Sequence, residues 1–158
     1  MTVKEFSDIC KDNNITFGAA ESFTGGQVAA QITDIPGASK FFKGSLITYF
    51  TEEKERILGI PRDVIEEHGV VSLEVAGEMA YRAKMLLDTD LALSFTGNAG
   101  PSSMENKPVG LIYIGVAFEQ VLRVYEYKLE GSRQEIQNKA IELAFDCAYE
   151  NYLKKFKK

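Results

Sequence analysis

The sequence predicts an α/β fold with a mixed central sheet, because helical and extended patterns alternate along the chain and two strands follow each other almost directly. The predicted strands span residues 15–20, 41–50, 91–95, 109–118 and 121–129. Only Glu119 and Gln120 separate the last two strands, and so short a connection requires an antiparallel hairpin. We therefore expect a mixed sheet rather than a wholly parallel one.

The helices are predicted from capping residues and from apolar residues that recur on one face. Thr2 with Glu5, and Ser132 with Glu135, form capping boxes that begin the first and last helices. The predicted helices span 2–13, 28–35, a short segment from Thr51 (a possible cap), 61–69, a segment from 72 and a long segment from 132. The inward stripes are Val75, Met79, Ala83 and Leu86 in the helix from 72, and Ile136, Ala140, Leu143, Cys147 and Ala148 in the last.

Composition is typical of a single globular domain, which we expect to span residues 1–158. Hydrophobic residues make up 45% of the chain and charged residues 26%, enough to build one sizeable core. No apolar run approaches the ~20 residues of a membrane-spanning helix, and acidic residues interrupt the apolar ones in 1–9. We therefore expect a cytoplasmic protein with no signal peptide and no membrane partner.

The charge pattern does not favour nucleic acid as a partner. The formal net charge is −5, and the one basic cluster lies at the extreme C-terminus, at residues 154–158. We interpret this cluster as a solvated helix end that suits the helix dipole, and a nucleic-acid-binding tail is the alternative. Cys10 and Cys147 lie in apolar helical patterns typical of buried, reduced thiols. With a single histidine and no clustered cysteines, no metal site is expected, and no cofactor.

The strongest candidate for a functional site is the turn that follows the first strand, with the sequence Glu21-Ser22-Phe23-Thr24-Gly25-Gly26. It places Ser22 at the carboxyl end of a strand, where α/β proteins commonly bind ligands. The two glycines permit close approach of a ligand, and the helix that follows offers N–H groups to an anion or an oxyanion. A purely structural interpretation makes Thr24 an N-cap and assigns the glycines to packing. The spacing matches neither a Walker A loop nor the dinucleotide fingerprint.

Two groups could activate Ser22. A Ser-His-Asp triad would need His68, the only histidine, which lies at a predicted helix end before Gly69. The other route is a lysine kept neutral by burial, and Lys54 is a candidate because it begins a short helix after the strand that carries Tyr49. Lys54 could equally be a surface residue of that helix.

A second unusual segment, Thr96-Gly97-Asn98-Ala99-Gly100-Pro101, follows the apolar strand 91–95. It is either an ordinary glycine–proline turn or a second wall of the same cleft, which would supply the Thr96 hydroxyl and backbone N–H groups.

The turn around Ser22 resembles the AESCTGG motif of the CinA C-terminal domain family, known also as nicotinamide mononucleotide amidohydrolases. The resemblance continues in the same order along nearly the whole chain. Its further segments are residues 33–39, Tyr49 with Lys54, 58–60, 68–72, 96–101, 107–110 and 131–133.

The resemblance implies a three-layer α/β/α sandwich with a mixed sheet, and hydrolysis of the carboxamide of nicotinamide mononucleotide without a metal. It implies that Ser22 is the nucleophile, that Lys54 is its general base and that Tyr49 assists in the proton network. The residues implied to bind or surround the substrate are Thr24, Gly25, Gly26, Thr96, Gly97 and Arg133, with Arg133 near the phosphate. The family also suggests a homodimer. Its members often carry a second, nucleotide-cleaving domain, and we do not expect that activity in this chain.

The chain departs from the family pattern at five positions. Phe23 replaces a small cysteine, Thr51 an asparagine, Asn98 an apolar residue and Ser132 an aspartate, and Gln137 stands where a second arginine is frequent. If that arginine binds the phosphate, this chain lacks one charge-assisted contact. Two alternatives therefore remain: a weak or inactive relative that binds a nucleotide or a protein partner, and an amidase for another small amide.

Overall fold

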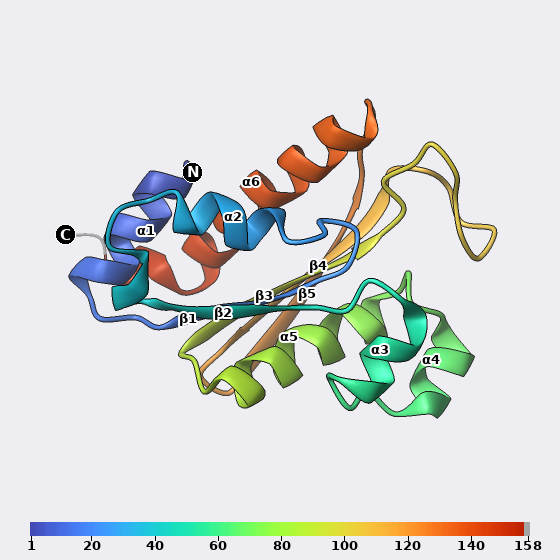
Figure 1. Cartoon of the computed structure of the whole chain (residues 1–158), viewed down its shortest axis with the longest axis horizontal. Coiled ribbons are helices and arrows are strands. Elements are labelled where there is room, and N and C mark those ends of the chain that lie inside the picture. Colours follow the sequence, from blue (N-terminus) through green and yellow to red (C-terminus); the bar gives the residue numbers. More distant parts are fainter. Residues whose placement is uncertain (157–158) are drawn as a thin grey trace.

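The structure, a computed structural model, describes residues 1–156 and has the predicted α/β architecture. A five-stranded mixed sheet, in the order β2-β1-β3-β4-β5, lies between two layers of helices (Figure 1). The strands are β1 (Phe17–Glu21), β2 (Phe42–Ile47), β3 (Leu91–Gly97), β4 (Leu111–Phe118) and β5 (Val121–Lys128). β1 pairs in parallel with β2 and β3, whereas β4 is antiparallel to both β3 and β5. The predicted hairpin and the mixed, three-layer sandwich are confirmed.

Helices cover both faces of the sheet. One face carries α1 (Val3–Asp12), α2 (Gln27–Thr33) and α6 (Arg133–Asn151), and the other carries α3 (Thr51–Arg56), α4 (Arg62–His68) and α5 (Leu73–Leu87) (Figure 1). Residues 1–156 also contain two short 3₁₀ helices, at Ala38–Lys40 and Leu153–Phe156. The capping boxes of α1 and α6 are present as predicted. None of the helices within residues 1–156 is long and apolar enough to cross a membrane.

Each face of the sheet has its own apolar core. The larger core lies under α1, α2 and α6 and is rich in aromatic side chains, and Phe6 stacks on Phe145 there with 4.4 Å between ring centroids. The smaller core lies under α5. Cys10 and Cys147 are both buried and unpaired, as expected. Of the basic C-terminal cluster, Lys157 and Lys158 lie outside the described residues.

Three local predictions were wrong. Leu86 does not face the core but is 58% exposed, because the inward stripe of α5 continues from Ala83 at a spacing of four, to the half-buried Leu87. Thr51 does not cap α3, since the capping position is Phe50 and no side chain accepts a hydrogen bond there. The second strand ends at Ile47, so Tyr49 lies in the connection to α3.

Candidate active site

The candidate site lies at the carboxyl ends of β1 and β3, which the fold brings side by side. Glu21, the last residue of β1, pairs with Phe95 of β3, and the Ser22 N–H donates a hydrogen bond to the Phe95 carbonyl at 3.0 Å. The chain leaves β1 through α2 on one face of the sheet and returns to β3 through α5 on the other (Figure 1). β1 therefore lies at the topological switch point, where α/β sheets open a crevice for ligands.

Ser22 and Lys54 form a direct pair. Lys54 Nζ lies 2.9 Å from Ser22 Oγ and donates a second hydrogen bond to the Thr48 carbonyl at 2.6 Å. The Lys54 side chain is only 1% exposed, although it comes from a short helix that was equally consistent with a surface position. The structure thus brings together the two residues that the sequence singled out as nucleophile and base.

Burial changes the acid–base chemistry of Lys54. Removal from water disfavours the ammonium form and lowers the pKa of Lys54 to about 8, against the opposing effect of the Glu105 carboxylate. A lysine with a pKa of about 8 is partly neutral near neutral pH, and a neutral amine can accept the proton of a serine hydroxyl. Ser22 therefore lies in hydrogen-bond contact with a lysine that loses its proton at a much lower pH than an exposed lysine.

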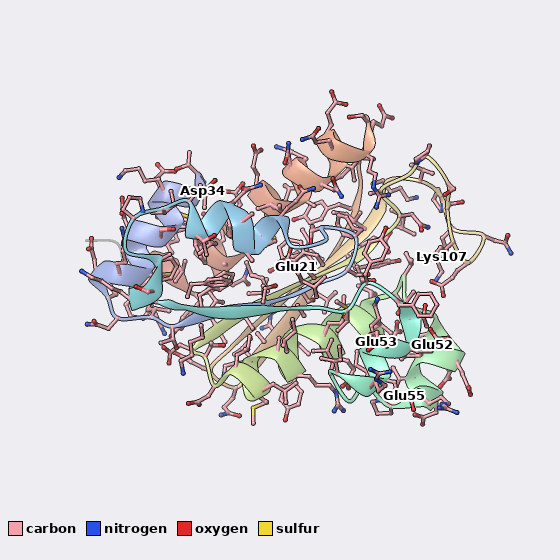
Figure 2. All side chains as sticks on the ribbon, in the orientation of Figure 1. Glu21, Asp34, Glu52, Glu53, Glu55 and Lys107 are labelled. Carbon is pink, nitrogen blue, oxygen red and sulfur yellow. The ribbon has the colours of Figure 1, made fainter. Side chains whose placement is uncertain are left out.

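Glu21, which the sequence analysis did not single out, occupies the N-terminus of α2. Its fully buried carboxylate accepts hydrogen bonds from the N–H groups of Gly26, Val28 and Ala29 and from the Ser45 hydroxyl, over distances of 2.7 to 3.3 Å. Figure 2 shows Glu21 between α2 and the sheet. The expectation that this helix offers free N–H groups to an external anion is therefore wrong, because an internal carboxylate already holds them.

The N–H groups that have no acceptor belong to the two residues directly after Ser22. Within residues 22–29 only the Phe23 and Thr24 N–H groups have no hydrogen-bond acceptor among the described residues. The Gly25 N–H donates to the Ser22 carbonyl at 3.0 Å. Of these two residues Phe23 lines the cavity beside Ser22, whereas Thr24 is fully buried, so the Phe23 N–H is the one that could meet an oxyanion there.

A cavity of about 160 Å³ opens beside Ser22. The residues that line it are Ser22, Phe23, Tyr49, Gly97, Asn98, Ala99, Gly100, Ser102, Met104 and Arg133. Residues 97–100 of the second predicted segment therefore form a wall of the same cleft, whereas Thr96 and Pro101 do not line it. Gly97 is required there, because a Cβ atom would lie 2.6 Å from the Leu111 carbonyl oxygen.

Arg133, at the start of α6, forms hydrogen bonds with two other segments that line the cavity. It donates one hydrogen bond to the Gly100 carbonyl at 2.7 Å and another to the Tyr49 hydroxyl at 2.9 Å. Tyr49 is exposed on the cavity wall, and within residues 1–156 no hydrogen bond joins it to Ser22 or Lys54. Arg133 and Tyr49 thus form an exposed part of the cavity wall, whereas Ser22 is a buried lining residue and contacts Lys54 behind it.

Four of the residues predicted to surround the substrate do not line the cavity. Thr24 is fully buried and its hydroxyl has no partner among the described residues, so it is not the N-cap of α2, a position that Gly26 occupies. Thr96 is buried and donates its hydroxyl proton to the Val70 carbonyl at 2.6 Å. Gly25 and Gly26 adopt φ angles of +54° and +101°, so the sharp turn itself accounts for both glycines.

The chain-specific residues Asn98 and Gln137 have internal partners. The Asn98 amide donates to the Met104 and Lys107 carbonyls at 3.2 Å and accepts from the Met104 N–H at 3.0 Å, which closes the 98–107 loop. Gln137 is buried and donates to the Phe23 carbonyl at 2.7 Å. Both side-chain amides thus take part in hydrogen bonds within the protein.

The loop that carries Met104 is anchored at a second point. The Glu105 carboxylate accepts hydrogen bonds from the Val70 and Val71 N–H groups at 3.0 and 2.7 Å, and Lys107 donates to the His68 and Val71 carbonyls. Figure 2 shows Lys107 at the same end of the molecule as α3 and α4. The loop is thereby fixed against the turn before α5.

His68 takes no part in the serine pair. It lies in the last turn of α4 and does not line the cavity. Its imidazole Nδ1 lies 3.5 Å from a Glu74 carboxylate oxygen. Within residues 1–156 no three histidine, cysteine, aspartate or glutamate side chains come together in a way that could hold a metal ion. The titratable side chain in contact with Ser22 is therefore a lysine and not a histidine.

Comparison with known proteins identifies the family of this chain and agrees with its fold. Residues 2–152 match the CinA C-terminal domain family, and the chain belongs to that family. A competence-damage inducible protein by name, from Caldanaerobacter subterraneus, is 43% identical over 139 residues, which cover 87% of this chain and 34% of that protein. A CinA-like protein of Dictyoglomus thermophilum is 44% identical over 131 residues, which cover 82% of this chain and 32% of that protein. The chain thus spans about a third of the length of the curated relatives it matches.

Solved structures show the same fold. The competence/damage inducible protein of Agrobacterium tumefaciens superposes with a TM-score of 0.89 at 26% identity, covering 94% of this chain and 92% of that one. A competence damage-inducible protein A from Klebsiella pneumoniae gives a TM-score of 0.90 at 22% identity, covering 96% and 97%, and supports the fold alone.

Proposed function

We propose that this chain is a metal-independent amidohydrolase that converts nicotinamide mononucleotide and water into the corresponding acid and ammonia. The observation that carries the proposal is the contact of 2.9 Å between the Ser22 hydroxyl and a buried lysine whose pKa is lowered to about 8. Amide hydrolysis needs a nucleophile, a base and donors for an oxyanion, and this site contains a candidate for each. The family resemblance supplies the identity of the substrate.

In the proposed reaction, Ser22 Oγ attacks the carboxamide carbon while Lys54 Nζ takes the hydroxyl proton. The carbonyl oxygen becomes an oxyanion that the Phe23 N–H can stabilise. The Lys54 ammonium then gives its proton to the leaving nitrogen, which departs as ammonia and leaves an ester on Ser22. A water molecule, deprotonated by the again neutral Lys54, hydrolyses the ester and restores the hydroxyl.

The size of the cavity favours an aromatic amide. Its volume of about 160 Å³ is close to that of an engineered cavity of about 150 Å³ that binds benzene, so it fits one ring with its carboxamide but not a whole nucleotide. The ribose and phosphate would then lie at the rim, where Arg133 is exposed. Two of the five guanidinium N–H groups have internal partners, and the others remain for a phosphate.

The direct test is ammonia release from nicotinamide mononucleotide by the purified chain. Ser22→Ala and Lys54→Met should each lower kcat/KM by about 10⁴-fold or more, since each removes a member of one catalytic unit. Lys139→Met is the matched control, because Lys139 is an exposed lysine of α6 that pairs only with Glu142, and it should retain full activity. Absence of ammonia release by well-folded wild type would refute the proposal for this substrate.

A second candidate, hydrolysis of another small aromatic amide, is favoured because Gln137 stands where the family frequently has a second arginine. Among the described residues Arg133 is then the one cationic side chain that lines the cavity. Nicotinamide mononucleotide and its phosphate-free riboside separate the two candidates. If phosphate is recognised, Arg133→Met should raise KM for the nucleotide by about tenfold to a hundredfold and leave KM for the riboside unchanged. Equal effects on both substrates would favour the small-amide candidate.

A further inference from the structure

Among the described residues, three that carry large apolar surfaces line the cavity beside Ser22, and each is held in a different way. Phe23 is 4% exposed and packs into the larger apolar core. Tyr49 is exposed, and its hydroxyl accepts a hydrogen bond from Arg133. Met104 is 49% exposed and belongs to the loop between β3 and β4, which projects from the end of the sheet (Figure 1). The first two are thus fixed by contacts of their own side chains, and Met104 is not.

Met104 is held through its backbone by the side chain of Asn98. The Met104 N–H donates to Asn98 Oδ1 at 3.0 Å, and Asn98 Nδ2 donates to the Met104 carbonyl at 3.2 Å. The same carbonyl accepts a hydrogen bond from the Lys107 N–H at 3.1 Å. Both polar backbone groups of Met104 are therefore engaged within the protein, and its half-exposed side chain is the part that remains for a ligand.

Stability alone does not explain this arrangement. Asn98 is 3% exposed, and a buried amide loses its hydration when the chain folds. The amide fixes a loop whose methionine stays half in solvent, so little apolar burial is gained in return. Asn98 stands in place of an apolar residue of the family pattern, and Phe23 in place of a small cysteine. Both departures concern residues that line one cavity, so they adjust its surface and leave the Ser22–Lys54 pair as it is.

An aromatic ring is the group that best fits this surface. The cavity volume of about 160 Å³ accommodates one ring with its carboxamide. A methionine thioether makes favourable contacts with aromatic rings, and its unbranched side chain adapts to the shape of a ligand. An aliphatic amide of the same size would fill the same space without the sulfur–aromatic contact.

We propose that Met104, held in place by Asn98, contacts the aromatic ring of the amide substrate and makes the site selective for aromatic over aliphatic carboxamides. Met104 is then a specificity-determining residue, and Asn98 is a positioning residue that acts through it. The inference rests on the proposed function for the place of the carboxamide at Ser22, and it narrows the substrate class of that site. Because the ring contact exists in the ground state and the transition state alike, Met104 should affect KM far more than kcat.

Methyl NMR of the methionines tests the contact without depending on turnover. The chain has four methionines, and the Met104 methyl resonance is assigned by its loss in Met104→Leu. Benzamide and cyclohexanecarboxamide carry the same carboxamide on rings of similar size, but only benzamide has an aromatic ring current. Benzamide should shift the Met104 methyl resonance and leave that of Met85, an exposed methionine of α5 outside the cavity, unchanged. Failure of benzamide to bind, or saturation without a shift at Met104, would overturn the inference.

Dissociation constants of the two amides, measured by ligand-observed NMR, separate the roles of the two residues. Met104→Ala should weaken benzamide binding by about twofold to tenfold and cyclohexanecarboxamide binding less. Asn98→Ile should cause a smaller loss. The double variant should bind benzamide as Met104→Ala does, because Asn98 acts through the side chain that is missing. Met85→Ala is the matched control and should change neither constant.

Two results of these titrations would contradict the proposal. Equal losses for both amides in Met104→Ala would exclude selectivity for the aromatic ring, and additive losses in the double variant would exclude action of Asn98 through Met104. The ammonia assay separates this inference from the proposed function. A Met104 shift in a protein that releases no ammonia would refute the reaction and leave the aromatic selectivity standing. Ammonia release with an unchanged KM in Met104→Ala would refute the inference alone.

Discussion

Beneath α1 and α6 the interior of the molecule is built from aromatic rings, whereas at the carboxyl ends of β1 and β3 it is built from polar groups. In the first region Phe6 contacts Phe17 edge-on at 5.0 Å and Phe145 in a stack at 4.4 Å. In the second region Glu21 and Lys54 are buried with their hydrogen-bond partners. Both regions exclude water, but in the first exclusion stabilises the fold and in the second it adjusts the chemistry of a base.

The difference explains why buried area alone does not describe this protein. Burial of an aromatic ring lowers the free energy of the folded state, whereas burial of the Lys54 ammonium raises it and is retained at the site of proposed catalysis. A protein can hold such a group only because a separate apolar core supplies stability. Substitutions in the aromatic core should therefore mainly lower the free energy of unfolding, whereas substitutions in the polar region should mainly change the activity and its pH dependence.

The largest effect on stability is expected in the aromatic core. Phe6→Ala removes a fully buried ring and both of its aromatic contacts, and should lower the free energy of unfolding by about 3 to 5 kcal/mol. Urea unfolding measures this change. The folded fraction should still release ammonia from nicotinamide mononucleotide with the wild-type pH midpoint, because Phe6 does not line the cavity. A shifted midpoint would show that the two regions are not independent.

A smaller, pH-dependent effect is expected at Lys54. The pKa of Lys54 is about 8 in the folded protein and has its ordinary value of 10.5 in the unfolded chain. Between these values the unfolded chain binds a proton that the folded protein lacks, so the free energy of unfolding rises with pH across this window. Below pH 8 the lysine is charged in both states and this dependence disappears.

Comparison with Lys54→Met isolates the contribution of this lysine, because all other groups titrate alike in both proteins. From pH 7 to pH 9.5 the wild type should gain about 2 kcal/mol relative to the variant, measured by urea unfolding at each pH. The same comparison with Lys139→Met should be flat. A flat difference for Lys54→Met as well would mean that its pKa is close to 10.5, and would remove the basis for a neutral lysine base.

The sequence predicts the polar region less completely than the apolar one. Strands, capping boxes and the hairpin depend on local patterns, and Ser22 was located because strand ends are local features too. The burial of Lys54 is not local: it is flanked by Glu53 and Glu55, and a short acidic helix is equally consistent with the surface. The contact of Gln137 with Phe23 spans 114 residues and has no local pattern at all.

The contacts of Glu21 are a second feature of the polar region that the sequence did not predict. A glutamate at the end of a strand carries no indication that it will hold the helix several residues later, because this depends on how sharply the chain turns at Gly25 and Gly26. Only one feature of the sequence indicates that Glu21 is buried: it is the last residue before Ser22, in a strand whose other residues are apolar or small. Asn98 offered a clearer indication, since it replaces an apolar residue of the family pattern.

The smallest effect is expected at Asn98, where polar groups hold a loop rather than a core. Asn98→Ile restores an apolar residue and removes three side-chain hydrogen bonds to the 98–107 loop. Because residues 101–106 are exposed and water can replace the lost bonds, global stability should fall by only about 1 kcal/mol. Amide hydrogen exchange at Met104 should nevertheless become faster, and KM should rise because Met104 lines the cavity.

Asn98→Asp is the informative companion, because it keeps the acceptor for the Met104 N–H and loses both donors. Exchange at Met104 should then stay closer to the wild-type rate than in Asn98→Ile, while KM still rises. If both variants leave exchange and KM unchanged, the loop is held by Glu105 and Lys107 alone. The polar region would then consist of the Ser22–Lys54 pair and its backbone donors, with the outer wall fixed independently of Asn98.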